Sequence, residues 1–280
     1  MTVVRSLVLC GFGINCEEET AAAWRLAGAQ TTVAHLGALL RGEPPLDGFD
    51  ILTFPGGFSF GDDLGAGKVL ANTVKYRRLA TGETLLARLV RFVEERGVVL
   101  GICNGFQALL KTGLLPNVGG DLDQEATLVR NDSGRFEDRW CECVSPAASR
   151  SPFLRGLERV RLPVRHGEGK LVIRDEAVRS AIVAHGLVSL CYCDSSGEPT
   201  GRYPDNPNGS EFACAALTDR TGRVLGLMPH PEAFLSFYND PAWPELRRGG
   251  ASDEAGHGLR LFLNVVDHVR RDRGRARGEP

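Results

Sequence analysis

Four short apolar runs in the first part of the chain each lead into a turn or a polar stretch, and helical segments separate them. The runs are Val3–Cys10, Thr31–His35, Asp50–Phe54 and Val98–Ile102. The composition of Glu17–Ala27 is helical, and the pattern of Glu83–Arg96 is typical of an amphipathic helix. Buried strands that alternate with such helices predict a mostly parallel sheet with helices on both faces. The fold class that we expect is therefore α/β.

The later part of the chain is richer in strands. Candidate strands are Val160–Val164, Lys170–Ile173, Val188–Cys193, Phe212–Leu217 and Val224–Met228. A last helix is expected to open at Asp253 and Glu254 and to run to about Arg270. We predict one domain over residues 1–270 and a polar, arginine-rich tail over residues 271–280.

Composition excludes several classes of protein. The chain has 280 residues, 33 of them Lys or Arg and 35 Asp or Glu, so the formal net charge is −2. Such a balance argues against nucleic-acid binding by bulk charge. No apolar run approaches the roughly 20 residues that a membrane helix needs. The N-terminus lacks the cleavage site of a signal peptide. We therefore expect a cytoplasmic protein that binds neither nucleic acid nor membrane.

The strongest local signal is a cysteine between glycines at the junction of a strand and a helix. Cys103 follows the run Val98–Ile102, and Gly101 and Gly105 flank it. This context is that of a nucleophile elbow with cysteine in place of serine. The following helix N-terminus favours a thiolate, and the N–H of Asn104 would point to a developing oxyanion. Cys103 is the predicted nucleophile.

A base and its partner are predicted after the strand Val224–Met228. His230 and Glu232 flank Pro231, which biases His230 toward an extended conformation. Residues two apart in an extended chain share one face, so Glu232 could orient the imidazole of His230. With Cys103 they would form a Cys-His-Glu triad.

A glycine pair ends a third strand and predicts the second donor of an oxyanion hole. Gly56 and Gly57 follow Pro55. Because glycine has no Cβ, the backbone N–H of Gly57 can point into a site without steric hindrance. This loop lacks the G-x-x-x-x-G-K-[ST] pattern of a nucleotide P-loop. The predicted oxyanion donors are thus the N–H groups of Gly57 and Asn104.

These motifs resemble those of class I, or triad, glutamine amidotransferases, whose sheet is flavodoxin-like. Further segments resemble the glutaminase subunits of phosphoribosylformylglycinamidine synthase, an enzyme of de novo purine biosynthesis. The similarity covers nearly the whole chain, from about residue 3 to about residue 268. The segments are Gly13–Thr20, Phe58–Asp63, Asn131–Glu137, His166–Gly169 and Asn206–Ser210.

The resemblance implies that the chain hydrolyses glutamine and passes ammonia to a large synthase subunit, usually with a small accessory subunit in the complex. It implies no cofactor and no metal in this chain, with ATP and Mg²⁺ on the large subunit. It also implies four substrate-binding residues: Gln107 would contact the bound glutamine, and Asn131, Ser133 and Phe136 would lie in a loop near its α-carboxylate and amino group. His166, Glu168 and Asn206–Ser210 match family segments without a derivable role.

Two other functions stay open from the residues. One is another cysteine-elbow enzyme of similar fold, peptidase-like or deglycase-like. The other is a scaffold subunit without catalysis. Two C-x-C pairs, Cys141/Cys143 and Cys191/Cys193, lie outside the resemblance, and we interpret them as buried apolar residues rather than as a zinc site.

Overall fold

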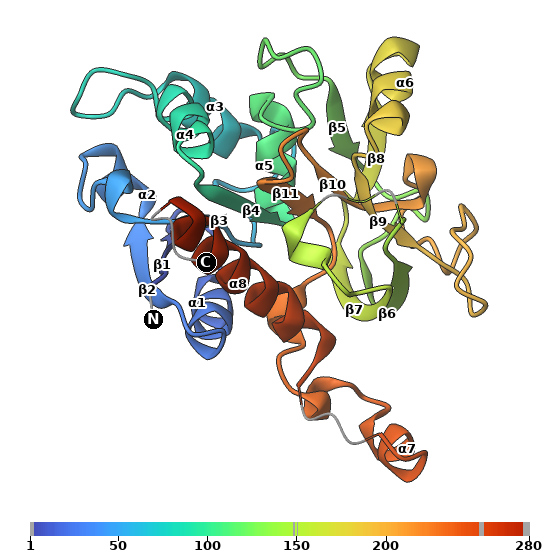
Figure 1. Ribbon diagram of the computed structural model, residues 1–280. Coiled ribbons are helices and arrows are strands. Elements are labelled where there is room, and N and C mark those ends of the chain that lie inside the picture. Colours follow the sequence, from blue (N-terminus) through green and yellow to red (C-terminus); the bar gives the residue numbers. More distant parts are fainter. Residues whose placement is uncertain (1–2, 148, 150, 252–254, 277–280) are drawn as a thin grey trace.

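The structure, a computed structural model, describes residues 3–147, 149, 151–251 and 255–276. In this part of the chain, nine strands form one sheet in the order β2-β1-β3-β4-β11-β10-β9-β6-β7 (Figure 1). The five parallel strands are β1 (Arg5–Cys10), β2 (Gln30–His35), β3 (Ile51–Phe54), β4 (Val98–Ile102) and β11 (Val224–Leu227). The predicted α/β class with helices around this sheet is confirmed.

The strand-rich part of the chain extends the same sheet with antiparallel strands. These are β6 (Glu137–Val144), β7 (Arg159–His166), β9 (Val188–Tyr192) and β10 (Cys214–Thr218). A separate antiparallel pair consists of β5 (Ala126–Val129) and β8 (Lys170–Ile173). Four successive antiparallel pairings separate β11 from β7, so these two strands run in the same direction. The segments that follow them therefore lie at the same end of the sheet.

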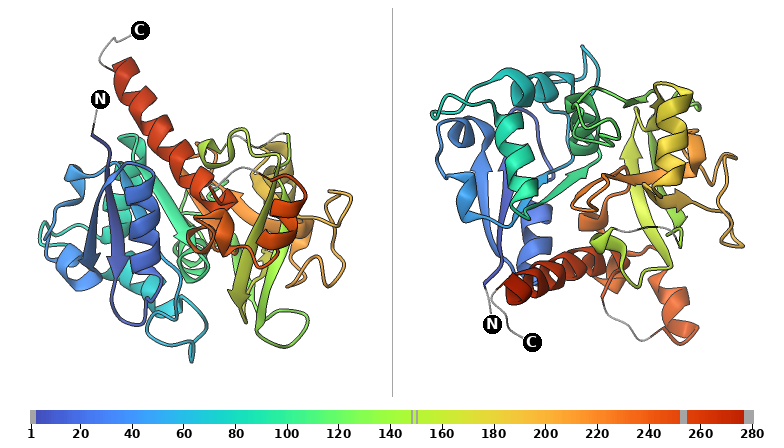
Figure 2. Two further views of the ribbon diagram at one scale, coloured as in Figure 1. Left: turned by 90° about the horizontal axis from the view of Figure 1, so that it is seen from below. Right: turned by 45° about the horizontal axis from the view of Figure 1, so that its top comes forward.

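Helices cover both faces of the sheet (Figure 2). One layer contains α1 (Glu17–Leu26) and α8 (His257–Ala276), which pack through an edge-to-face contact of Trp24 and Phe262 at 4.7 Å. The other layer contains α3 (Lys68–Tyr76), α4 (Leu85–Glu94) and α5 (Asn104–Thr112). Shorter helices are α2 (Leu36–Leu40), α6 (Glu176–Ala184) and α7 (Trp243–Arg248), of which α7 projects from the body of the molecule in Figure 1. None of the described helices is long and apolar enough to cross a membrane.

The structure differs from the sequence-based expectation at the last helix. This helix begins at His257, and Asp253 and Glu254 lie outside the described residues. It continues to Ala276, six residues beyond the expected end. Arg273 on this extension pairs with Asp50 and donates a hydrogen bond to the carbonyl of Val3 at 3.0 Å. These contacts hold part of the expected tail against the sheet.

Helices α3 and α6 were not predicted, and one expected strand starts later. Phe212 adopts a left-handed conformation, with φ 56°, in a single 3-10 turn, and β10 begins only at Cys214. The remaining 3-10 turns are short: Leu46–Gly48, Pro152–Leu154, Pro231–Ala233 and Phe237–Asn239.

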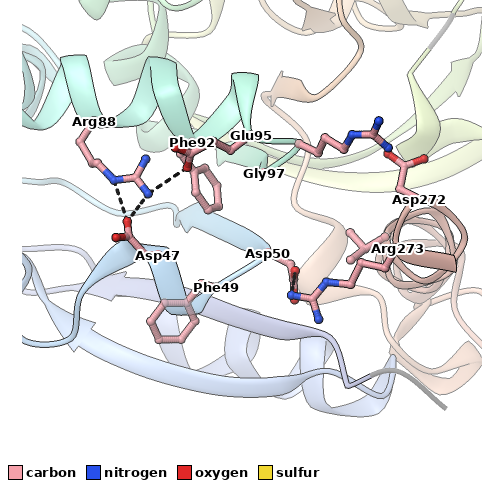
Figure 3. Close-up of a pocket in the computed structure, with 11 residues that line it drawn as sticks. Asp47, Phe49, Asp50, Arg88, Phe92, Glu95, Gly97, Asp272 and Arg273 are labelled. Carbon is pink, nitrogen blue, oxygen red and sulfur yellow. Dashed lines mark hydrogen bonds and ion pairs between the residues drawn. The ribbon is translucent and has the colours of Figure 1, made fainter. Parts of the chain in front are cut away.

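A cavity of about 340 Å³ lies at the end of the sheet where the central strands β3 and β4 begin (Figure 3). Several of the charged side chains in its walls are paired with one another. The buried Arg88 binds Asp47 and, at 3.2 Å, Glu95, and Arg273 binds Asp50. We interpret this set as a structural ion-pair network that ties α4 and α8 to the sheet.

Candidate active site

Cys103 occupies a strained turn between β4 and α5. Its backbone has φ 49° and ψ −102°, a region that a residue with a side chain rarely adopts. Gly105 lets the start of α5 pack closely against the end of β3, because a Cβ at this position would lie 1.9 Å from the carbonyl oxygen of Phe54. The thiol is buried, and its Sγ lies 3.7 Å from the carbonyl oxygen of Arg165. The geometry is that of the predicted nucleophile elbow.

His230 and Glu232 reach the same end of the sheet because β11 runs parallel to β4. The N–H of His230 is anchored on the carbonyl of Pro163 at 2.8 Å. Its Nδ1 contacts Oε1 of Glu232, and both side chains are almost fully buried. The local path differs from the expected extended chain, since Pro231 opens a 3-10 turn, yet the two side chains still meet.

Burial and the neighbouring groups act on His230 in opposite directions. Burial alone would lower the pKa of His230, but the carboxylate of Glu232 and the nearby thiols of Cys103 and Cys16 raise it well above its usual range. Its Nε2 has no hydrogen-bond partner among the described residues. An imidazole nitrogen without a partner, on a base held by a buried carboxylate, is suited to exchange a proton with Cys103 or a leaving group.

Arg165, at the end of β7, was not expected at this site. Its Nη2 lies 3.2 Å from Nδ1 of His230 and 3.7 Å from Oε1 of Glu232. The signal in the sequence was its position directly before His166–Gly169, a segment that resembles the family. Sequence spacing alone does not bring residue 165 to residue 230.

The loop after β3 lies beside the elbow and is fixed by two connections. The carbonyl of Gly56 accepts hydrogen bonds from the N–H groups of Asn15 and Cys16, at 3.3 and 3.2 Å. The side chain of Asn104, which is buried, accepts the N–H of Ser59 at 3.1 Å. Gly57, with φ 146°, lines the same pocket as Cys103. The structure thus brings the two predicted oxyanion donors, Gly57 and Asn104, to one site.

A pocket of about 260 Å³ opens over Cys103. Gln107 and Phe136 line it, as expected for two residues near glutamine. The Nε2 of Gln107 donates to the carbonyl of Glu168 at 2.7 Å. The pocket wall carries both signs of charge and two aromatic rings: Asp62, Glu168, Arg130, Arg135, Arg165, Phe58 and Phe136. Such a wall suits a small zwitterion.

Asn131 and Ser133 are not among the residues that line this pocket. The amide of Asn131 is buried, and its Nδ2 donates to the carbonyls of Arg135 and His166 at 2.9 and 2.8 Å. Its Oδ1 accepts the N–H of Gly169 at 3.0 Å. Asn131 therefore shapes the pocket wall from behind. The Oγ of Ser133 is buried without a hydrogen-bond partner among the described residues.

His166, Glu168 and the 206–210 loop gain structural roles. His166 and Glu168 line the pocket. Burial, with the nearby charge of His230, lowers the pKa of His166 to about 3, so this imidazole stays neutral. Ser210 stabilises the backbone that follows Glu168, since its Oγ donates to the carbonyl of Gly169 at 3.1 Å and accepts the N–H of Leu171 at 2.9 Å.

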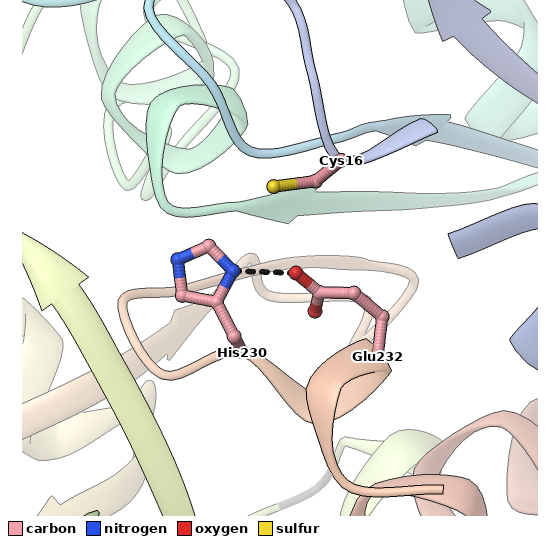
Figure 4. Close-up of side chains that lie close together, drawn as sticks. All are labelled: Cys16, His230 and Glu232. Carbon is pink, nitrogen blue, oxygen red and sulfur yellow. Dashed lines mark hydrogen bonds and ion pairs between the residues drawn. The ribbon is translucent and has the colours of Figure 1, made fainter. Parts of the chain in front are cut away.

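Cys16 is the second residue that sequence reasoning did not place at the site. Figure 4 shows its thiol beside the paired side chains of His230 and Glu232. One ligand atom of each residue lies within 4.8 Å of the others, which is a spacing that a metal ion could use. However, Nδ1 and Oε1 already bind each other, the cation of Arg165 adjoins them, and burial raises the pKa of Cys16. The geometry favours an acid-base pair over a metal site.

The cysteines of the two C-x-C pairs are free and buried, in agreement with their interpretation as apolar residues. Burial raises the pKa of Cys141 to about 12 and that of Cys191 to about 11. Among the described residues, the thiols of these pairs form no group with metal-ligand spacing.

Comparison with known proteins agrees with this geometry. A family model described as a CobB/CobQ-like glutamine amidotransferase domain matches residues 3–269. The chain is 43% identical over 271 residues to phosphoribosylformylglycinamidine synthase subunit PurQ of Dehalococcoides mccartyi, across 96% of this chain and 99% of that protein. It is 36% identical over 274 residues to the protein of the same name from Methanococcus maripaludis, across 95% and 97%. A chain in the structure of PurLQS from Thermotoga maritima is 25% identical, with a TM-score of 0.68 over 96% of this chain and 100% of that one.

Proposed function

This chain belongs to the family of CobB/CobQ-like glutamine amidotransferases, and on that premise we propose that it is the PurQ-type glutaminase subunit of phosphoribosylformylglycinamidine synthase. One observation carries the proposal. A strained, buried Cys103 and the hydrogen-bonded pair of His230 and Glu232 lie around one pocket at the end of the parallel strands. These are the parts that acyl transfer through a thioester requires.

The chemistry follows from these positions. The sulfur of Cys103 attacks the side-chain amide carbon of glutamine, and the N–H groups of Gly57 and Asn104 stabilise the oxyanion. His230 holds the proton that the thiol of Cys103 loses and gives it to the leaving ammonia, with Glu232 orienting its ring. His230 then takes a proton from water, which attacks the γ-glutamyl thioester and releases glutamate. The catalytic residues are thus Cys103, His230 and Glu232.

Substrate binding is assigned to the pocket around the thiol. Gln107 and Phe136 contact the bound glutamine, and the wall that contains them suits a zwitterion. Asn131 and Ser133 act on the substrate through the shape of their loop. The hydrogen bonds of Asn131 to the backbone around His166 support this indirect role.

The ammonia passes to the large synthase subunit, which forms the ribonucleotide amidine, and a small accessory subunit completes the complex. The likeness to a chain of PurLQS supports this assembly. The use of ATP and Mg²⁺ is assigned to the large subunit, and no metal to this chain. We place the protein in the cytoplasm, where purine nucleotides are made. The match over nearly the full length of PurQ relatives disfavours a peptidase or a deglycase.

A Cys103→Ala chain, assembled with its partners, tests the proposal. Synthesis that depends on glutamine should stop, whereas synthesis supplied with ammonia should continue, because Cys103 acts only in ammonia production. Equal loss of both activities would mean that Cys103 supports assembly. Unchanged glutamine-dependent synthesis would mean that the chain is a scaffold.

A further inference from the structure

One arginine joins the acid-base pair to the substrate pocket. The Nη2 of Arg165 lies 3.2 Å from Nδ1 of His230 and 3.7 Å from Oε1 of Glu232, and Arg165 is also one of the residues that line the pocket above Cys103. The Nε of Arg165 is buried and has no hydrogen-bond partner among the described residues. The guanidinium is therefore incompletely bonded where it lies, although its side chain is about one-third exposed (36%).

This position conflicts with the proton arrangement that catalysis needs. To accept the proton of Cys103 at Nε2, His230 must carry its other proton on Nδ1 and donate it to Glu232. An arginine N–H is always a donor, so it cannot bond to an Nδ1 that is itself protonated. Its positive charge also opposes an imidazolium at this distance. Arg165 thus competes with His230 for the carboxylate of Glu232.

The other groups around His230 do not remove this conflict. Cys103 and Cys16 lie beside the ring, and the neighbouring His166 stays neutral because burial lowers its pKa to about 3. Glu232 is the carboxylate that contacts the ring. A second carboxylate brought into the pocket could draw Arg165 away from this pair, because a carboxylate can accept two parallel hydrogen bonds from the Nε and Nη2 of a guanidinium.

We infer that Arg165 binds the α-carboxylate of glutamine and that this binding withdraws its guanidinium from His230 and Glu232, so that the substrate itself completes the catalytic pair. The inference rests on the proposed function. Arg165 is then a positioning residue, which couples recognition of free glutamine to the proton arrangement of His230. A side-chain amide without an adjacent carboxylate would enter the pocket but leave the arginine on the pair.

The first test compares two substrates in the reconstituted synthase. L-glutamine and 4-aminobutanamide carry the same reacting amide, but the second compound lacks the α-carboxylate. In an Arg165→Met complex, kcat/KM for glutamine should fall about 10- to 100-fold, as expected for a lost charge-assisted pair, with no fall for 4-aminobutanamide. Arg165→Lys should recover only part of the loss, because an ammonium lacks the planar fork.

Matched controls are available in the same pocket, since Arg130 and Arg135 also line it. If Arg130→Gln or Arg135→Gln produces the selective loss for glutamine and Arg165→Met does not, the inference is wrong. An equal loss for both substrates in Arg165→Met would also overturn it. If the wild-type complex hydrolyses no glutamine, the proposed function fails instead, so the two failures can be told apart.

A second test observes the imidazole directly. In a Cys103→Ala chain labelled with ¹⁵N-histidine, glutamine should shift the Nδ1 signal of His230 toward the protonated nitrogen that donates to Glu232. Addition of 4-aminobutanamide should not do so, and an Arg165→Met, Cys103→Ala chain should show the shifted signal without ligand. A merely structural role for Arg165 predicts the same signal with both ligands, and that result would refute the coupling.

Discussion

The backbone carbonyl of Gly56 accepts the N–H of Cys16 at 3.2 Å, so the turn after β1 holds the loop after β3 in place. The peptide between Gly56 and Gly57 is trans, because every cis peptide among the described residues precedes a proline. A trans peptide directs its N–H opposite to its carbonyl. The N–H of Gly57 therefore points away from Cys16, and Gly57 lines the pocket that contains Cys103.

A Gly57→Ala variant should lose glutaminase activity by about 100-fold or more, because one oxyanion donor contributes that much. An added Cβ would lie 2.7 Å from the carbonyl oxygen of Gly13 and 2.8 Å from the nitrogen of Asn15, so the peptide must move. Glutamate release by the complex measures the effect. Gly82→Ala is the control, since Gly82 also has a positive φ of 89° but no atom within 4 Å of the added carbon. Similar losses in both variants would assign the effect to backbone strain alone.

A Glu232→Gln variant should shift the acid limb of the pH profile of kcat/KM toward lower pH and reduce its maximum. The carboxylate of Glu232 makes the largest contribution among the groups that raise the pKa of His230 against burial, so its removal makes the Cys103–His230 pair release its proton more readily. His230→Ala should lose nearly as much activity as Cys103→Ala, and Glu232→Ala less. An acid limb at unchanged pH in Glu232→Gln would contradict the assigned role of Glu232.

His166 should make the wild-type chain less stable in mild acid. Its pKa falls from 6.5 to about 3 on folding because it is buried, so the unfolded chain binds one more proton between these pH values. Stability from this residue is therefore lost as the pH falls from 6.5 toward 3, by about 2–3 kcal/mol at pH 4.5. A His166→Phe chain should lack this component. Urea unfolding of both chains at pH 7.5 and pH 4.5 tests it, and parallel changes in the two chains would refute it.

Removal of the Arg88 cation should lower the free energy of unfolding less than removal of the charges of its two partners. Its side chain is only 7% exposed, whereas those of Asp47 and Glu95 are 77% and 62% exposed. Arg88→Met leaves two carboxylates that water can solvate, so the free energy of unfolding should fall by about 1 kcal/mol or less. The double change Asp47→Asn, Glu95→Gln leaves a buried cation unpaired and should cost about 3 kcal/mol. Urea unfolding decides, and a larger loss in Arg88→Met would reverse the interpretation.

The thiols should differ sharply in reactivity. Cys141, Cys143, Cys191 and Cys214 are buried, and burial raises the pKa of each. Iodoacetamide at pH 8 should therefore alkylate Cys103, which lines the open pocket, well before these four. Mass spectrometry of the native chain after short labelling gives the order. Early labelling of Cys141 or Cys191 would show that the sheet around them opens.

The sequence by itself determined the elements whose signals are local. An apolar run followed by a cysteine between glycines is enough to predict β4, the elbow and α5, because the pattern of a strand, a tight turn and a helix lies within a few consecutive residues. The spacing of His230 and Glu232, together with the resemblance to triad amidotransferases, completed the proposed catalytic set. The order of the parallel strands then places both segments at one end of the sheet.

Only the tertiary structure decided which distant residues surround that set. Cys16 reaches His230 from the start of α1, and Arg165 reaches it from the end of β7; no periodicity in either segment encodes these contacts. Asn131 was expected to bind glutamine, but its side-chain amide forms hydrogen bonds with the backbone of His166 and Gly169. The extension of α8 depends on Arg273 meeting Asp50, more than 200 residues earlier in the chain. Such contacts depend on the packing of strands and loops that are distant in sequence, and therefore on the complete fold.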